Sequence, residues 1–134
     1  DALWFHRRAI LIETNPDRYC PFPGGRGEPD CAAITAAIEA SAGVRCSASL
    51  GKPSALMMAE ALRGLNVDPS RVLMVGDRLH TDIAMAHAAG CASALVLTGD
   101  TSASDLEGLD ASFRPTFIVD RIDQLIPAVQ ETFD

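Results

Sequence analysis

Short apolar runs alternate with segments of helical periodicity along most of the chain. Strands are predicted at 9–12, 72–75, 94–97 and 116–119. Helices are predicted from apolar spacing and capping residues at 31–42, 55–65, 82–89, 102–109 and 122–133. Strands that alternate with helices are typical of an α/β fold built on a parallel sheet.

The clearest strand–helix–strand unit runs from Arg71 to Gly99. Its first strand ends at Gly76-Asp77, so Asp77 stands at the carboxyl end of the strand, where open α/β sheets bind ligands. Thr81 is predicted as the N-cap of the helix that starts at Asp82. Two carboxylates are therefore expected at one rim of the sheet. They alone leave open a purely structural role, because acidic residues are common in turns and caps.

The helix faces and the intervening loop follow from local patterns. Asp30 is expected to cap helix 31–42, which Gly43 ends, and Ile34 and Ile38 are predicted to share its apolar face. Segment 17–30 is rich in proline and glycine and is predicted to be a loop. The apolar stripe of helix 55–65 is predicted to comprise Leu56, Met57, Ala59, Leu62 and Leu65.

Two motifs carry a family resemblance. GKPS at 51–54 and VGDRLHTDI at 75–83, together with the phrases TNPD, AAIEASAG and LVLTGDTS, resemble the haloacid-dehalogenase-like phosphohydrolases. The flanking phrases are similar to the branch with para-nitrophenyl, phosphoglycolate, and nucleotide or sugar phosphatases. The resemblance implies the carboxyl-terminal half of a three-layer α/β/α Rossmann-like core at 46–134, preceded by a remnant of an α/β cap at 1–45.

The same resemblance implies a Mg²⁺-dependent phosphatase. Asp77 is the expected metal ligand, with Asp82 as the supporting metal-site carboxylate, and carboxylate oxygens suit Mg²⁺. Lys52 is expected to be the catalytic cation that also contacts the substrate phosphoryl group. Arg78 and Thr81 are the further expected substrate-binding residues. A solvated surface lysine is the alternative for Lys52.

The nucleophile that the family places in Asp-x-Asp is absent, because this sequence contains no Asp-x-Asp. Thr14 also imitates a phosphoryl-binding motif, but TNPD matches a phrase found late in the cap, so Thr14 is interpreted as a structural turn. Two explanations stay open for the missing nucleophile. The chain is either the carboxyl-terminal part of a longer phosphatase or a natural truncated relative. In either case the chain alone is expected to be inactive.

Composition and charge narrow the partners. A net charge of −7 argues against nucleic-acid binding, and no apolar run is long enough to span a membrane. Segment 1–8 lacks the layout of a signal peptide. Cys20, Cys31, Cys46 and Cys91 form no Cys-x-x-Cys pair, which favours reduced thiols in a cytoplasmic protein over a disulfide framework. His80 and His87 are not expected to bind metal.

The expected partner is therefore a small phosphorylated metabolite, and an incomplete sheet favours homo-oligomers. One alternative function is a non-catalytic module for binding or assembly through an exposed sheet edge. Another is a phosphate- or nucleotide-binding module without turnover, which would use Lys52 and helix amino termini.

Overall fold

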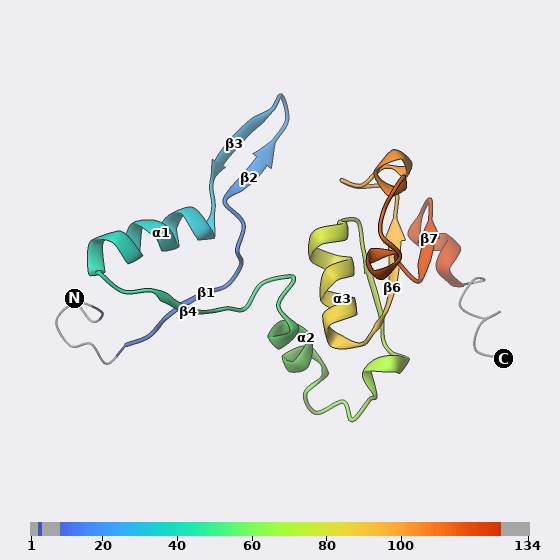
Figure 1. Cartoon of the computed structure of the whole chain (residues 1–134), viewed down its shortest axis with the longest axis horizontal. Coiled ribbons are helices and arrows are strands. Elements are labelled where there is room, and N and C mark those ends of the chain that lie inside the picture. The colour runs from blue at the N-terminus through green and yellow to red at the C-terminus, as the bar shows by residue number, and fades with distance from the viewer. Residues whose placement is uncertain (1–2, 4–8, 127–134) are drawn as a thin grey trace. The chain divides into compact units, whose positions relative to one another are not determined.

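The computed structural model describes residue 3 and residues 9–126 (Figure 1). The chain divides into two compact units, Asp1–Lys52 and Pro53–Asp134, and each is described by itself. Segment 1–8 was predicted not to be a signal peptide. Most of it lies outside the described residues. Within the described ranges, no helix has the length and apolar character needed to cross a bilayer.

In its described part, residues 9–52, the first unit contains two small sheets and one helix. Strand β1 (Leu11–Glu13) pairs in parallel with β4 (Cys46–Ser49), so the strand predicted at 9–12 is confirmed with a shift of about one residue. Helix α1 (Cys31–Ala42) lies between them in sequence and is confirmed at its predicted bounds. Because β4 pairs with β1, β4 belongs to the first compact unit, which extends to Lys52.

Helix α1 begins and ends as its capping residues predict. The Asp30 carboxylate accepts a hydrogen bond from the Cys31 N–H at 2.7 Å. Gly43 has a φ of 64° at the carboxyl end, a conformation that glycine adopts without strain. The predicted apolar face is wrong at Ile34, which is 57% exposed, whereas the neighbouring Thr35 is buried.

The predicted loop at 17–30 is wrong in part, because it contains an antiparallel hairpin. Strands β2 (Tyr19–Phe22) and β3 (Arg26–Pro29) pair with each other, and Gly24 and Gly25 have positive φ at the turn. Within the described residues neither strand has a second partner, so both are edge strands. Proline is tolerated in edge strands, which explains how a proline-rich segment forms this hairpin.

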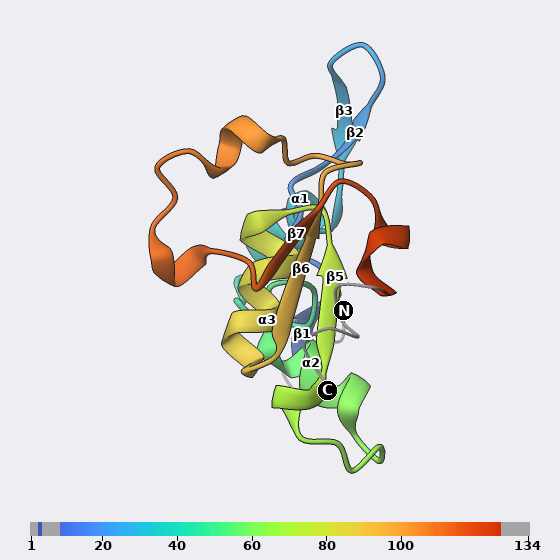
Figure 2. The same ribbon diagram turned by 90° about the vertical axis from the view of Figure 1, so that its right-hand side faces the viewer.

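The second unit is built on a parallel sheet that has three strands in its described part, residues 53–126 (Figure 2). Strands β5 (Leu73–Gly76), β6 (Ala92–Val96) and β7 (Phe117–Val119) lie in that order. The three predicted strands are therefore confirmed to within about two residues. Strand β6 is central, and its Leu95 side chain is fully buried. The fold is α/β and Rossmann-like.

Helices α2 (Ala55–Leu62) and α3 (Ala84–Ala89) cover this sheet. Met58 of α2 packs with Met85, Ala86 and Cys91 in one buried cluster, which Leu62 extends. The predicted stripe is wrong at four of its five positions, because Leu56, Met57, Ala59 and Leu65 are exposed. The Ser54 hydroxyl accepts from the Leu56 N–H at 3.3 Å and sets the start of α2, so Met58 and Leu62, four residues apart, face the core.

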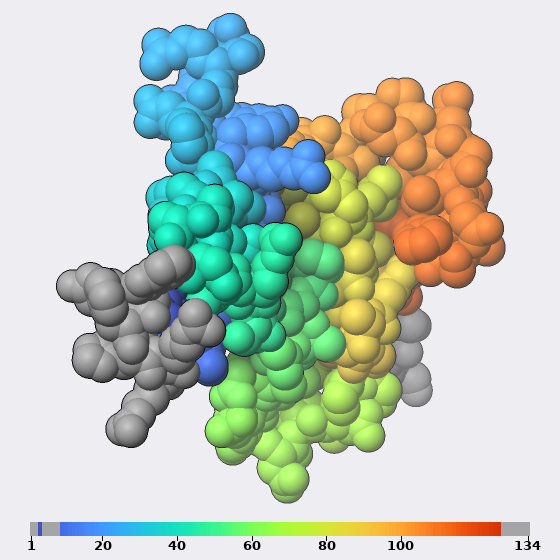
Figure 3. Space-filling model, turned by 60° about the vertical axis from the view of Figure 1, so that its left-hand side comes forward, coloured from blue at the N-terminus to red at the C-terminus, as the bar shows by residue number. Residues whose placement is uncertain are grey.

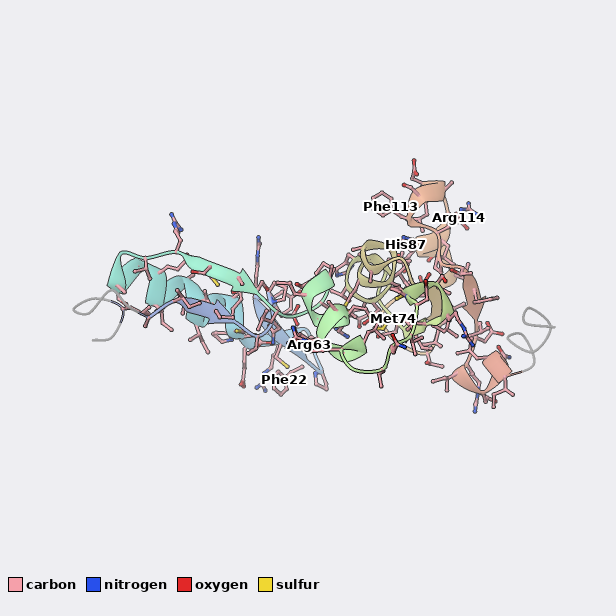
Figure 4. All side chains as sticks on the ribbon, turned by 90° about the horizontal axis from the view of Figure 1, so that it is seen from below. Phe22, Arg63, Met74, His87, Phe113 and Arg114 are labelled. Atoms are coloured by element: carbon pink, nitrogen blue, oxygen red, sulfur yellow. The ribbon has the colours of Figure 1, made fainter. Side chains whose placement is uncertain are left out.

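The segment 97–116, between β6 and β7, stands out as a lobe (orange in Figure 3). The helix predicted at 102–109 is only a 3₁₀ turn, Ala103–Leu106, closed by Ser102 and Asp105. A second 3₁₀ turn, Ala111–Phe113, follows, and Phe113 and Arg114 project from it (Figure 4). Of the helix predicted at 122–133, the structure describes the 3₁₀ turn Ile122–Gln124 at its start, and positions 127–133 lie outside the described residues.

Candidate active site

The candidate site is built around the loop that follows β5. The backbone N–H groups of Asp77 and Arg78 donate to Oδ2 of Asp82 at 3.2 and 3.1 Å. The Asp82 side chain is only 2% exposed. A Cβ on Gly76 would overlap the Asp82 carboxylate, so glycine is required for this close approach. The Gly-Asp-x-x-x-x-Asp motif thus forms a loop in which the Asp82 carboxylate accepts hydrogen bonds from the backbone at Asp77 and Arg78.

A π-helical turn, Leu79–Ile83, connects this loop to α3. The Arg78 carbonyl accepts from the N–H groups of Asp82 and Ile83 at 3.0 and 3.2 Å. The prediction that Thr81 is an N-cap is therefore wrong, because Thr81 lies inside the turn. Its hydroxyl is buried, and within the described residues it has no hydrogen-bond partner. Leaving such a group unpaired costs about 1–3 kcal/mol.

The segment after β6 encloses Asp77 from the other side. The Asp100 N–H donates to Asp77 Oδ2 at 2.8 Å, and the Thr101 N–H donates to the Asp77 carbonyl at 3.1 Å. A Cβ on Gly99 would overlap the Asp77 carboxylate. No site residue was predicted in 99–101. The available signal was TGDT directly after the neighbouring strand, because carboxyl ends of parallel strands meet at one edge.

Arg78 reaches the same segment through its side chain. Its Nε lies 2.5 Å from Oδ2 of Asp100. The Arg78 side chain is 30% exposed and that of Asp100 is 59% exposed, so the pair lies at the surface of the site. An ion pair therefore joins the loops that follow β5 and β6.

Lys52 lies in the turn between β4 and α2 and is half-buried. Gly51 packs on Asn15, and a Cβ there would come within 2.8 Å of the Thr14 carbonyl oxygen. Asn15 Oδ1 accepts from the Asp17 N–H at 2.9 Å, which forms a tight turn after β1. The structure brings Asp77, Arg78, Thr81 and Asp82 together on one loop. Lys52 belongs to the first unit and is described there.

A Mg²⁺ site was predicted at Asp77 and Asp82. Mg²⁺ is usually held by one or two protein carboxylates with waters and substrate phosphate. The carboxylate pair and the unpartnered buried hydroxyl of Thr81 fit part of such a site. Within residue 3 and residues 9–126, no three His, Cys, Asp or Glu side chains form a metal-binding group. Asp77 and Asp82 are therefore the two protein carboxylates that this loop offers to a Mg²⁺ ion.

The chain matches the HAD-hydrolase-like family over residues 49–125. This region begins at the end of β4 and includes GKPS, the Asp77–Asp82 loop, strands β5, β6 and β7 of the second unit and the segment that encloses Asp77. The match covers more than half of the chain, and the chain belongs to this family.

Several relatives and solved structures that the chain matches are named as phosphatases. The chain is 33% identical to the glycerol-3-phosphate phosphatase of Gallus gallus over 129 residues, covering 91% of this chain and 41% of that protein. It is 35% identical to chronophin of Mus musculus, covering 91% and 43%. A 4-nitrophenylphosphatase from Thermotoga maritima superposes with a TM-score of 0.78 at 40% identity, covering 92% and 46%. The chain thus spans less than half the length of these relatives.

Proposed function

We propose that this chain supplies the carboxyl-terminal part of a Mg²⁺-dependent phosphatase that acts on a small phosphorylated metabolite in the cytoplasm. The observation that carries the proposal is the enclosure of Asp77 between Asp82 on one side and residues 99–101 on the other. This places a carboxylate at the ligand-binding edge of a parallel sheet. The names of the glycerol-3-phosphate phosphatase and the 4-nitrophenylphosphatase among its relatives support the same reaction class.

Each site residue has a proposed role. Asp77 and Asp82 would hold Mg²⁺, which offsets negative charge on the phosphoryl group. Asp82 also keeps the Asp77 backbone in place through its hydrogen bonds. The Lys52 ammonium would stabilise charge on the transferring group. Arg78 and Thr81 would bind phosphate oxygens, with the Thr81 hydroxyl gaining the partner that the described residues do not provide.

The domain assignment is part of this proposal, with residues 1–45 as the end of a cap and 46–134 as part of the core. The nucleophile must then come from an amino-terminal segment, because this sequence has no Asp-x-Asp. We use "full-length phosphatase" for the protein that joins such a segment to this chain. Reading the coding sequence upstream of Asp1 for an apolar strand followed by D-x-D-G tests this requirement.

The functional test compares the chain alone with the full-length phosphatase. With para-nitrophenyl phosphate and Mg²⁺, the chain alone should show no turnover and the full-length phosphatase should be active. Asp77→Asn should abolish that activity. Asp110→Asn is the matched control, since Asp110 only caps the 3₁₀ turn at 111–113 and asparagine is an equally good cap. Turnover by the chain alone that depends on Asp77 would contradict the proposal.

Metal binding gives a second readout. Calorimetric titration of the chain alone should detect no tight Mg²⁺ binding, because two carboxylates offer too few oxygens without the Asp-x-Asp ligands. A micromolar dissociation constant that Asp77→Ala abolishes would show that the site is complete by another route.

One observation favours the alternative of an assembly module. Within residues 9–126, β5 pairs with β6 alone, which leaves its other edge available for pairing with another chain. Sedimentation of the chain alone distinguishes the two functions. A stable homo-oligomer without phosphatase activity in the full-length protein would support the assembly module.

A further inference from the structure

Asp100 contacts the site loop through two chemically independent groups. Its backbone N–H donates to Oδ2 of Asp77, and its carboxylate binds Nε of Arg78. Asp100 and Arg78 are 22 residues apart in the sequence and meet because β5 and β6 are adjacent parallel strands. One residue after β6 therefore contacts two consecutive residues after β5.

The two contacts respond differently to substitution. The N–H contact depends on the backbone and persists when the side chain changes. Asp100→Asn keeps nearly the same size and shape but removes the negative charge, so the ion pair with Arg78 is lost and only a weaker neutral hydrogen bond to the amide oxygen can remain. The effect of the Asp100 carboxylate on Arg78 can therefore be measured while the backbone contact of Asp100 with Asp77 stays in place.

The Arg78–Asp100 ion pair is expected to orient the Arg78 guanidinium more than it stabilises the fold. Partly exposed pairs contribute only about 0–1 kcal/mol to folding. A contact at Nε acts on the guanidinium nitrogen next to the side-chain stem, so it restrains the rotation of the planar group. Arginine binds phosphate through this rigid plane, and its orientation determines which oxygens it can reach.

We infer that Asp100 is a positioning residue, which orients the Arg78 guanidinium for a substrate phosphate across the ends of β5 and β6. This inference rests on the proposed phosphatase function. It adds a residue of the segment after β6 to the site and gives its carboxylate a role although it carries the same charge as the substrate. Asp100 acts through Arg78 and does not contact the reacting atoms.

The ion pair itself is testable in the 134-residue chain without any activity. In a ¹⁵N-correlated NMR spectrum, the Arg78 Nε–H signal should be shifted and protected from exchange with water. It should move towards the free-arginine position in Asp100→Asn and stay unchanged in Asp110→Asn, which removes the same charge from the same lobe. An Arg78 signal that is identical in the wild type and Asp100→Asn would overturn the inference.

The functional consequence is measured in the full-length phosphatase. Asp100→Asn should raise KM about threefold to tenfold, as expected for a weakened charge-assisted contact, and change kcat by less than about twofold. The increase should shrink at 1 M NaCl, since the Debye length falls to about 3 Å. In an Arg78→Gln background, Asp100→Asn should have no further effect on KM.

The outcomes separate the inference from the proposed function. Absence of phosphatase activity in the wild-type full-length protein would defeat the proposed function, while the NMR comparison would still decide whether Asp100 orients Arg78. An active wild type with equal KM in Asp100→Asn and Asp110→Asn would defeat the inference alone. A lower KM in Asp100→Asn would also defeat it, because Asp100 would then hold Arg78 away from substrate.

Discussion

The two compact units differ in what holds them together. Every buried apolar side chain that the structure describes belongs to the second unit, where Leu95, Ile83 and Met85 form its interior. In the first unit the described large apolar side chains are at least partly exposed, and Ile12 and Ile34 are among them. Thr35 is the buried polar side chain of that unit.

The first unit has local polar contacts at both ends of α1. Asp30 caps α1, and the Glu39 carboxylate accepts from the Cys46 N–H at 2.7 Å and pairs with Arg45. Each such contact has a modest net effect on stability, whereas apolar burial is the main driving force of folding. The loop with Asp77 is therefore attached to the part of the chain with the stronger core, and polar contacts matter most in the part that carries Lys52.

The largest expected difference is in core substitutions. Leu95→Ala should lower the free energy of unfolding of the second unit by about 2–5 kcal/mol, because it leaves a cavity in β6. Ile34→Ala in α1 should change stability by no more than about 0.5 kcal/mol, because that side chain is mostly exposed. Urea unfolding of both variants measures the difference. Equal destabilisation would show that Ile34 packs against something beyond the described contacts.

The next prediction asks whether the first unit contributes chemistry. In the full-length phosphatase, Lys52→Met keeps the apolar stem, so stability should fall by no more than about 1 kcal/mol. Turnover should fall about 100-fold or more in kcat/KM through loss of an electrostatic contact. Lys52→Arg should not restore activity fully, since guanidinium is broader than ammonium. Near-normal kcat/KM in Lys52→Met would remove Lys52 from the mechanism.

The sequence predicts the second unit better than the first for a physical reason. A strand buried on both faces is a continuous apolar run, so 72–75 and 94–97 are recognisable without tertiary information. Edge strands rich in proline have no such signature, and the hairpin at 19–29 was missed. Helix faces were also mispredicted in α1 and α2. Alanine and other apolar residues occur on all sides of both helices, so the sequence pattern does not distinguish which face is buried.

The site divides in the same way. Asp77 and Asp82 were predicted because both lie on one local loop of readable spacing. Asp100 could not be assigned, since its contacts with Asp77 and Arg78 exist only when β6 lies beside β5. The capping role predicted for Thr81 failed because a π-helical turn takes it into the interior. The catalytic roles themselves stay predictions.

Thr81 in the second unit and Thr35 in the first are both buried, and substituting them should give smaller changes than the core and Lys52 substitutions. Thr81→Val removes a hydroxyl without a partner in the described structure, so stability should stay equal or rise by about 1 kcal/mol. In the full-length phosphatase the same change should raise KM about tenfold if the hydroxyl binds phosphate. Thr35→Val is the matched change in the first unit. Thr35 lies one helical turn after Cys31 and contributes to lowering the pKa of the Cys31 thiol, so loss of its hydroxyl should cost about 0.5–1.5 kcal/mol.

Thermal melts and steady-state kinetics of the two threonine variants give both quantities. Clear destabilisation by Thr81→Val would mean that its hydroxyl has a structural partner. Unchanged KM in that variant would remove Thr81 from substrate binding.

The smallest expected effect is a pH dependence confined to the first unit. The Cys46 N–H above all, and Arg45 after it, lower the pKa of Glu39 below its ordinary value of 4.5. The folded state therefore favours the ionised form of the Glu39 carboxyl more than the unfolded state does. The resulting stabilisation is fully present above pH 4.5 and is lost as the pH falls through the lowered pKa.

Glu39→Gln should therefore lower the Tm of the first unit at pH 7 by a few degrees at most. The difference from the wild type should vanish once the pH is low enough to protonate Glu39 in the folded protein. Glu28→Gln, an exposed change in β3, is the control and should leave the Tm unchanged at every pH. Hydrogen exchange at the Cys46 N–H, followed from pH 7 downwards, measures the contact directly. Equal protection of that N–H in the wild type and Glu39→Gln at pH 7 would show that the negative charge of Glu39 does not strengthen its contact with β4.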